Sequence, residues 1–211
     1  MTQARAREEQ RWLGIHLSGP NADRTVIAIC ELRDGRAALV QMIDRIGSRG
    51  NLTSDERVVD VILNAKAQAE IFVDVPLGLP PCLRCERPSC PSAIKCEDLS
   101  VAYMLSMNSG AKTKRRAFSP QLHRVWDVFS KAQNPNFEPS FSANLAPLVL
   151  RGKVLQKRLA SLRQGHFLME TDISMSLAAI APSFGIAMDK IRLYKSFEHG
   201  SAVRHLSLIH I

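Results

Sequence analysis

Short apolar runs separated by turn residues fill the first part of the chain. These runs predict strands over residues 12–17, 25–32 and 37–43. Asp34-Gly35, between the second and third runs, is typical of a tight β-hairpin turn. The short connections predict an antiparallel meander of three strands.

The pattern then changes to a helical period. Thr53 followed by Glu56 is a capping-box signature, and apolar positions at helical spacing follow it as far as Ala69. Residues 70–75 predict a fourth strand. Because a helix separates this strand from the meander, we expect a crossover that places it beside the first strand and parallel to it.

The second half of the chain alternates helical segments with one further strand. Ser119-Pro120 predicts a helix start, since Ser caps a helix well and Pro fits its first turn. The other segments predicted here are helices over 98–107, 143–163 and 174–181, and a strand over 167–171. The sequence therefore predicts an α/β protein with a five-stranded mixed sheet flanked by helices.

Composition is that of an ordinary globular protein, with 45% hydrophobic and 23% charged residues among 211. No apolar run approaches the roughly 18 residues that span a membrane, and the charged N-terminus lacks a signal-peptide core. We therefore expect a cytoplasmic protein with no membrane partner. The expected organisation is a disordered tail over 1–10, a single domain over 11–205 and a non-native or truncated end over 206–211.

Basic residues exceed acidic ones, giving a formal net charge of +8. This charge permits a polyanion partner such as DNA or RNA without requiring one. A basic run in a predicted loop is either a solvated segment or a phosphate contact. The run consists of Lys112, Lys114, Arg115 and Arg116.

Four of the five cysteines follow the fourth strand with the spacing C-x2-C-x4-C-x5-C. They are Cys82, Cys85, Cys90 and Cys96. In a reducing compartment such a cluster favours a metal site over disulfides. Four thiolates suit a structural Zn²⁺, and an iron–sulfur cluster is chemically open to them as well. Nearby Pro88 and Pro91 favour a rigid zinc knuckle, and the remaining Cys30 is expected as a buried thiol.

Acidic residues end the fourth and fifth strands. Asp74 precedes a proline-rich loop, so it is either a site residue at the sheet edge or a turn cap. Glu170 is likewise either a site residue or a surface residue of its strand. His16 ends the first strand and, judged alone, is a structural histidine.

The order of these elements resembles the RNase H-like fold. The motifs LGIHLSGP at 13–20, IFVDVPLGLPP at 71–81, FLMET at 167–171 and LYK at 193–195 resemble a domain-of-unknown-function family of predicted nucleases with that fold. Members of that family include chains with a cysteine cluster directly after the Asp-Pro strand. The resemblance covers residues 12–205.

The resemblance implies carboxylates gathered at one sheet edge to hold Mg²⁺ or Mn²⁺ for phosphodiester hydrolysis. Asp74 and Glu170 match the family's acids on the fourth and fifth strands. His16 stands where the family pattern Gly-Ile-Asp has its Asp. An imidazole suits transition metals better than Mg²⁺ and removes one negative charge, so we expect impaired activity in this chain.

Three functions follow as competing expectations. The first is a metal-dependent nuclease that uses Asp74, Glu170 and His16. The alternative is a non-catalytic nucleic-acid-binding protein with a structural zinc knuckle. A phosphotransferase is the third, because sugar kinases share the core sheet, but the sequence has no clear paired Gly-rich phosphate loops.

Overall fold

The computed structural model of the 211-residue chain describes residues 10–19, 24–65, 69–109, 118–133, 139–143, 145–162, 165–185 and 187. The chain forms two compact units. The sheet unit comprises residues 1–75 and 150–211, and the cysteine unit comprises residues 76–149. The cysteine-rich segment 82–96, expected as a loop within the single domain over 11–205, falls in the second unit.

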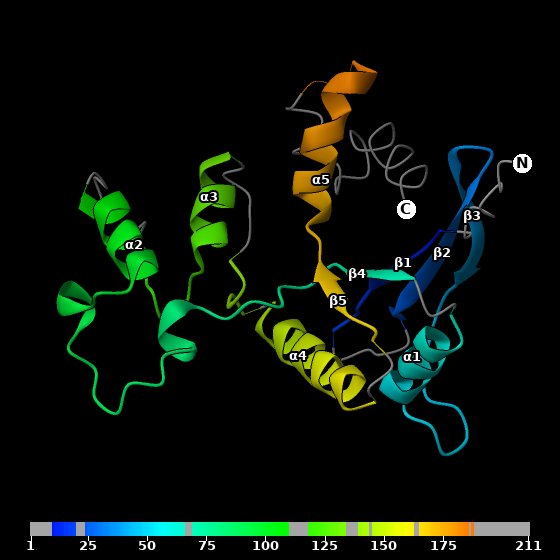
Figure 1. Cartoon of the computed structure of the whole chain (residues 1–211), viewed down its shortest axis with the longest axis horizontal. Helices are drawn as coiled ribbons and strands as arrows, with labels where there is room; N and C mark the ends of the chain where they lie inside the picture. The colour runs from blue at the N-terminus through cyan, green and yellow to red at the C-terminus, as the bar shows by residue number, and fades with distance from the viewer. Residues whose placement is uncertain are drawn as a thin grey trace, which may run out of the picture. The chain divides into compact units, whose positions relative to one another are not determined.

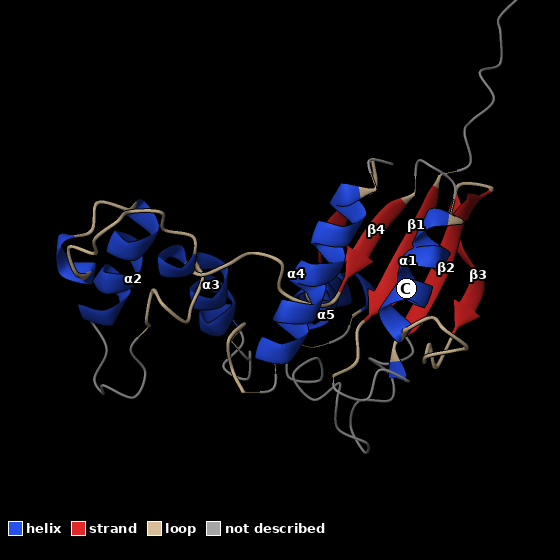
Figure 2. Cartoon of the chain, turned by 90° about the horizontal axis from the view of Figure 1, so that it is seen from below, coloured by secondary structure: helices blue, strands red, loops and turns tan. Residues whose placement is uncertain are grey.

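A five-stranded sheet in the order β3-β2-β1-β4-β5 forms the sheet unit. Its strands are β1 (Arg11–His16), β2 (Val26–Arg33), β3 (Arg36–Ile43), β4 (Glu70–Val73) and β5 (Leu168–Glu170). The meander β1-β2-β3 is antiparallel, whereas β4 runs parallel to β1 on one side and to β5 on the other (Figure 1). Figure 2 shows β1 to β4 side by side. The predicted mixed sheet, the meander and the placement of the fourth strand are confirmed.

Local chemistry accounts for the hairpin and for the first helix. Asp34 and Gly35 both have positive φ, at 51° and 75°, which matches the tight turn predicted for this pair. Helix α1 (Ser54–Leu63) begins at the predicted capping box. Thr53 Oγ1 accepts the Glu56 amide at 3.3 Å, and the Glu56 carboxylate accepts the Thr53 amide at 2.7 Å.

Apolar residues of the central strands and of the flanking helices form the core of the sheet unit. The buried side chains include Leu13, Ile15, Ile27, Ile71 and Val73 from the strands, Val58 and Ile62 from α1, and Leu155 and Leu159 from α4 (Ala146–Ser161). Cys30 is also buried, as expected. The last helices that the structure describes in the sheet unit are α5 (Ile173–Ile180) and the short helix η5 (Ala181–Phe184).

The cysteine unit contains short helices and a buried polar cluster. The helices are η2 (Pro81–Leu83), η3 (Ala93–Lys95), α2 (Leu99–Ser109), α3 (Val125–Gln133) and the first residues of α4. In the cluster, the Asp127 carboxylate accepts the backbone amide and the guanidinium of Arg124, and the hydroxyl of Ser140. Asp127 is 1% exposed, so these bonds offset the cost of burying its charge.

The start of α3 differs from the prediction. The chain forms a turn after Ser119-Pro120, and α3 begins only at Val125. The Ser119 amide donates to His123 Nδ1 at 3.0 Å, while Asp127 satisfies the Arg124 amide at 2.9 Å. The cap is therefore supplied by Asp127 from within the helix, and the predicted start at Ser119-Pro120 is wrong.

Several predictions concern residues outside the described ranges. These are the tail over 1–9, the LYK motif, the end over 206–211, and Lys112, Lys114, Arg115 and Arg116. Of the helices that the structure describes, none combines the length and the apolar character needed to cross a membrane.

Candidate functional site

Asp74 and His16 meet at the edge of the sheet where the parallel strands β1 and β4 end. His16 Nδ1 is in direct hydrogen-bond contact with Asp74 Oδ2. The other carboxylate oxygen, Oδ1, accepts the backbone amide of Leu17 at 3.1 Å. The His16 side chain is 58% exposed and the Asp74 side chain 13%, so the acid lies beneath the imidazole. The sequence placed these two residues at one edge, and the structure pairs them.

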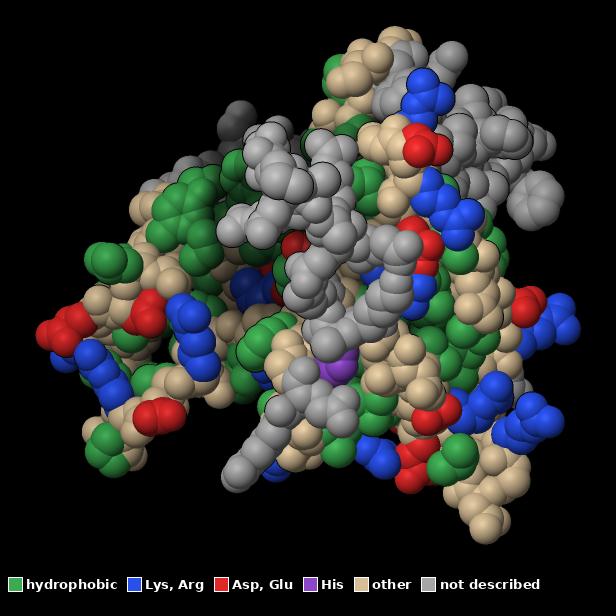
Figure 3. All heavy atoms as spheres, turned by 45° about the vertical axis from the view of Figure 1, so that its right-hand side comes forward, with side chains coloured by type: hydrophobic (Ala, Val, Ile, Leu, Met, Phe, Trp, Pro, Cys, Tyr) green, Lys and Arg blue, Asp and Glu red, His purple; other side chains and the backbone are tan. Residues whose placement is uncertain are grey.

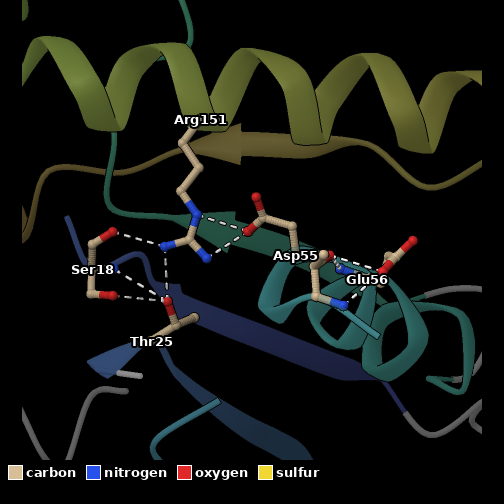
Figure 4. Close-up of polar contacts among 6 residues, drawn as sticks. Ser18, Thr25, Asp55, Glu56 and Arg151 are labelled. Carbon is tan, nitrogen blue, oxygen red and sulfur yellow. Dashed lines mark hydrogen bonds and ion pairs between the residues drawn. The ribbon is translucent and has the colours of Figure 1, made fainter. Parts of the chain in front are cut away.

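The backbone beyond His16 is held by Arg151, which the sequence analysis did not single out (Figure 4). Arg151 reaches from α4 and donates to the Ser18 carbonyl at 2.8 Å and to Thr25 Oγ1 at 3.1 Å. Two further bonds, at 2.5 and 2.7 Å, join its guanidinium to Asp55 Oδ1 on α1. Arg151 therefore fixes the end of β1 against both helices.

A signal for Arg151 was present in the sequence. It falls at helical spacing between apolar residues of the predicted 143–163 helix, three residues after Leu148 and four before Leu155. A charged residue within an apolar stripe needs a buried partner. The partner was not predictable, since Asp55 lies 96 residues away in the sequence.

Glu170 ends β5 at the same edge of the sheet but does not join the pair in a metal-binding group. Its Cα registers with Val73, one position before Asp74. Side chains alternate between the two faces of a strand. This register therefore places Glu170 on the same face of the sheet as Val73 and not on the face of Asp74. Across the described ranges, no three His, Cys, Asp or Glu side chains form a group that could hold a metal ion. The predicted convergence is thus limited to His16 and Asp74.

The cysteine unit contains a cavity of about 450 Å³ that all four clustered cysteines line. Burial raises the pKa of the Cys82 thiol, and charge interactions with the other three cysteines raise it further. Cys85 and Cys90 are exposed. The four thiols share one space, which fits the donor chemistry of zinc, but they do not gather as a preformed metal-binding group. A zinc site at these four cysteines therefore stays a prediction.

Charge on the surface is mixed where it can be seen. Figure 3 shows Lys and Arg side chains interspersed with Asp and Glu among the described residues of one face. The ion pairs Arg87–Glu97 and Arg158–Glu56 illustrate this pattern within the two units.

Chemically, the described edge offers one carboxylate bound to one imidazole. Such a pair orients the histidine ring, and within the described residues it is not part of a larger group of His, Cys, Asp or Glu side chains that could hold a metal ion. Comparison of the chain with protein-family models, with curated proteins and with solved structures finds no match.

Proposed function

We propose that this chain is an RNase H-like protein of the metal-dependent nuclease type, in which phosphodiester hydrolysis is impaired. The strand order β3-β2-β1-β4-β5, with an acid after β4, supports the fold assignment. The observation that carries the functional proposal is the His16–Asp74 contact. It occupies the place where the resemblance implies two metal-binding carboxylates.

The described residues do not fit a two-metal cluster. Such a cluster needs several carboxylate oxygens directed at hard cations. Here one Asp74 oxygen binds the His16 ring, the other binds the Leu17 amide, and Glu170 registers with Val73. No metal-dependent step follows from this arrangement, so cleavage is expected to be weak or absent. Phosphate contacts by basic side chains do not need the metal, so binding to nucleic acid should survive.

Substitution of His16 tests the proposal directly. His16→Asp restores the carboxylate of the family pattern, whereas His16→Asn removes the imidazole without adding charge. We expect Mn²⁺ binding, measured by calorimetry, to increase in His16→Asp alone. Cleavage of single- and double-stranded DNA and RNA with Mg²⁺ or Mn²⁺ should increase in the same variant and disappear when Asp74→Asn is added.

Two results would contradict this reading. Robust cleavage by the unmodified chain, abolished by Asp74→Asn, would show that the site works with His16. Absence of both Mn²⁺ binding and cleavage in a folded His16→Asp variant would remove the nuclease assignment and leave the second candidate.

The second candidate is a non-catalytic nucleic-acid-binding protein with a structural zinc knuckle. The cavity lined by Cys82, Cys85, Cys90 and Cys96 favours it, because four thiolates are the donor set of structural zinc sites. Zinc there would stabilise the fold rather than catalyse a reaction. Nucleic-acid binding that is lost when zinc is removed, together with no cleavage by a folded His16→Asp variant, would support this candidate over the first.

A further inference from the structure

A second cavity of the cysteine unit, of about 280 Å³, combines an aromatic ring with two arginines. Trp126 lines it together with Arg84, Arg124 and the loop residue Gly78. None of the described residues that line it is an Asp or a Glu. The cavity is therefore apolar at its aromatic wall and cationic beside it.

The aromatic wall is accessible and extends beyond the cavity. Trp126 is 42% exposed and Phe129, one turn further along α3, is 44% exposed. Their ring centroids are 5.5 Å apart and their planes are tilted by 31°. Exposed aromatic rings of this kind are the surfaces on which unpaired bases stack in proteins that bind single strands.

The two arginines have different settings. Arg124 is buried and fixed by Asp127, so its position is determined by the fold. Arg84 is exposed, donates to Ser100 Oγ at 3.3 Å and has a charge interaction with Asp98, so its guanidinium stays at the surface near one acid. The unit as a whole carries nine Lys or Arg against five Asp or Glu between residues 76 and 149. This balance is complementary to a phosphate backbone.

We infer that the cysteine unit binds single-stranded nucleic acid, with a base stacked on Trp126 and a backbone phosphate at Arg84. The inference rests on the proposed nucleic-acid function and names its substrate class. The cavity, of about 280 Å³, is at the small end of the range for ligand pockets, and the contacts inferred for it are one base and one phosphate. A paired duplex would not present a free base face to Trp126.

Fluorescence of Trp126 is the direct test. The chain has two tryptophans, so Trp12→Phe leaves Trp126 as the sole reporter. The probes are oligothymidylate, oligouridylate, an abasic strand of equal length and a duplex. We expect quenching and tight binding with the first two, and weak binding without quenching for the abasic strand and the duplex. Comparison of the thymidylate and uridylate arms then distinguishes DNA from RNA.

Substitutions separate stacking from charge. Trp126→Leu should weaken single-strand binding about 5- to 150-fold, the range measured for loss of one stacked base. Arg84→Gln should weaken it and reduce its salt dependence. The matched controls are Phe167→Leu, an aromatic residue of the sheet unit that is 77% exposed, and Arg87→Gln, whose charge is paired with Glu97. Both controls should bind like the parent.

The outcomes are distinguishable from those of the nuclease test. Equal binding of the abasic strand and oligothymidylate, or unchanged binding by folded Trp126→Leu, would overturn the inference even if His16→Asp cleaves. No binding to any strand would overturn it too and would favour a protein partner on the α3 aromatic surface. Quenching by single strands without cleavage in His16→Asp would uphold the inference while removing the nuclease assignment.

Discussion

His16 and Asp74 are in hydrogen-bond contact across two neighbouring parallel strands, at the point where both strands end. The same carboxylate accepts the Leu17 amide at 3.1 Å, and the Asp74 amide donates to the Ile15 carbonyl at 3.1 Å. Asp74 thus continues the ladder between β1 and β4 by one further step. It therefore has a structural role in addition to any chemistry at this edge.

This double role predicts a graded response at Asp74. Asp74→Ala leaves the Leu17 amide without its carboxylate partner and should lower the free energy of unfolding by about 1–3 kcal/mol. Asp74→Asn keeps an oxygen that can accept this bond and should cost clearly less. Urea denaturation of both variants checks the difference. If both substitutions are neutral, the contact with Leu17 contributes nothing and the acid is not a structural cap.

Replacing Arg151 should lower the stability of the sheet unit more than replacing an exposed arginine of the same helix, α4. Arg151→Met removes bonds to Asp55, Ser18 and Thr25, and hydrogen bonds involving a charged group contribute about 1.5–3 kcal/mol. We expect the free energy of unfolding to fall by about 2–3 kcal/mol.

Arg158→Met is the matched control for that measurement. Arg158 pairs with Glu56 at 3.3 Å and its side chain is 45% exposed, so the loss should be about 0.5 kcal/mol or less. Thermal and urea unfolding of the two variants give the comparison. Similar losses of unfolding free energy at both positions would mean that the polar contacts of Arg151 stabilise the protein no more than an exposed ion pair does.

Zinc content tests the cysteine cavity. We expect purified protein to carry about one zinc per chain, with Cys90→Ser losing it and Cys30→Ala retaining it, since four thiolates make a closed site and Cys30 lies in the sheet. Elemental analysis of the three proteins is the measurement. Iron with acid-labile sulfide would support a cluster instead, and neither metal, or zinc retained in Cys90→Ser, would disprove the zinc site.

Local signals made much of the sheet unit predictable. The Asp34-Gly35 turn, the Thr53–Glu56 capping box and the apolar run before Asp74 each act over a few residues, so the sequence carries them directly. The adjacency of β1 and β4 followed from the crossover rule. The pairing of His16 with Asp74 is a consequence of that adjacency.

Two kinds of contact account for what was missed. The start of α3 depends on a local contact, the bond from the Arg124 amide to the Asp127 carboxylate three residues later, which Ser140 also binds. The anchor at Arg151 depends on Asp55, far away in the sequence. Similarly, the register of β5 against β4 sets where Glu170 lies, and a one-residue shift changes the face of its side chain.

Glu31 should make the stability of the sheet unit depend on pH in the acid range. Glu31 lies directly opposite Arg11 in the β1–β2 ladder and is in direct contact with it, while Arg33 binds the other oxygen at 3.3 Å. The hydrogen bond from Arg11, with a further bond from Arg33, holds the pKa of the Glu31 carboxyl below its ordinary value.

A lowered pKa in the folded state means that the unfolded chain binds more protons in this range, so stability rises with pH there. The contribution of Glu31 is fully present above the ordinary glutamate pKa of about 4.3 and is lost as the pH falls through the lower folded value.

Glu31→Gln removes this titration. The difference in unfolding free energy between parent and variant should therefore be largest near neutral pH and shrink below pH 4.3 or so. Urea unfolding across the acid range measures it, with Glu97→Gln as the control because its side chain is 83% exposed. A difference that stays constant with pH would show that Glu31 is held by packing and not by its charge.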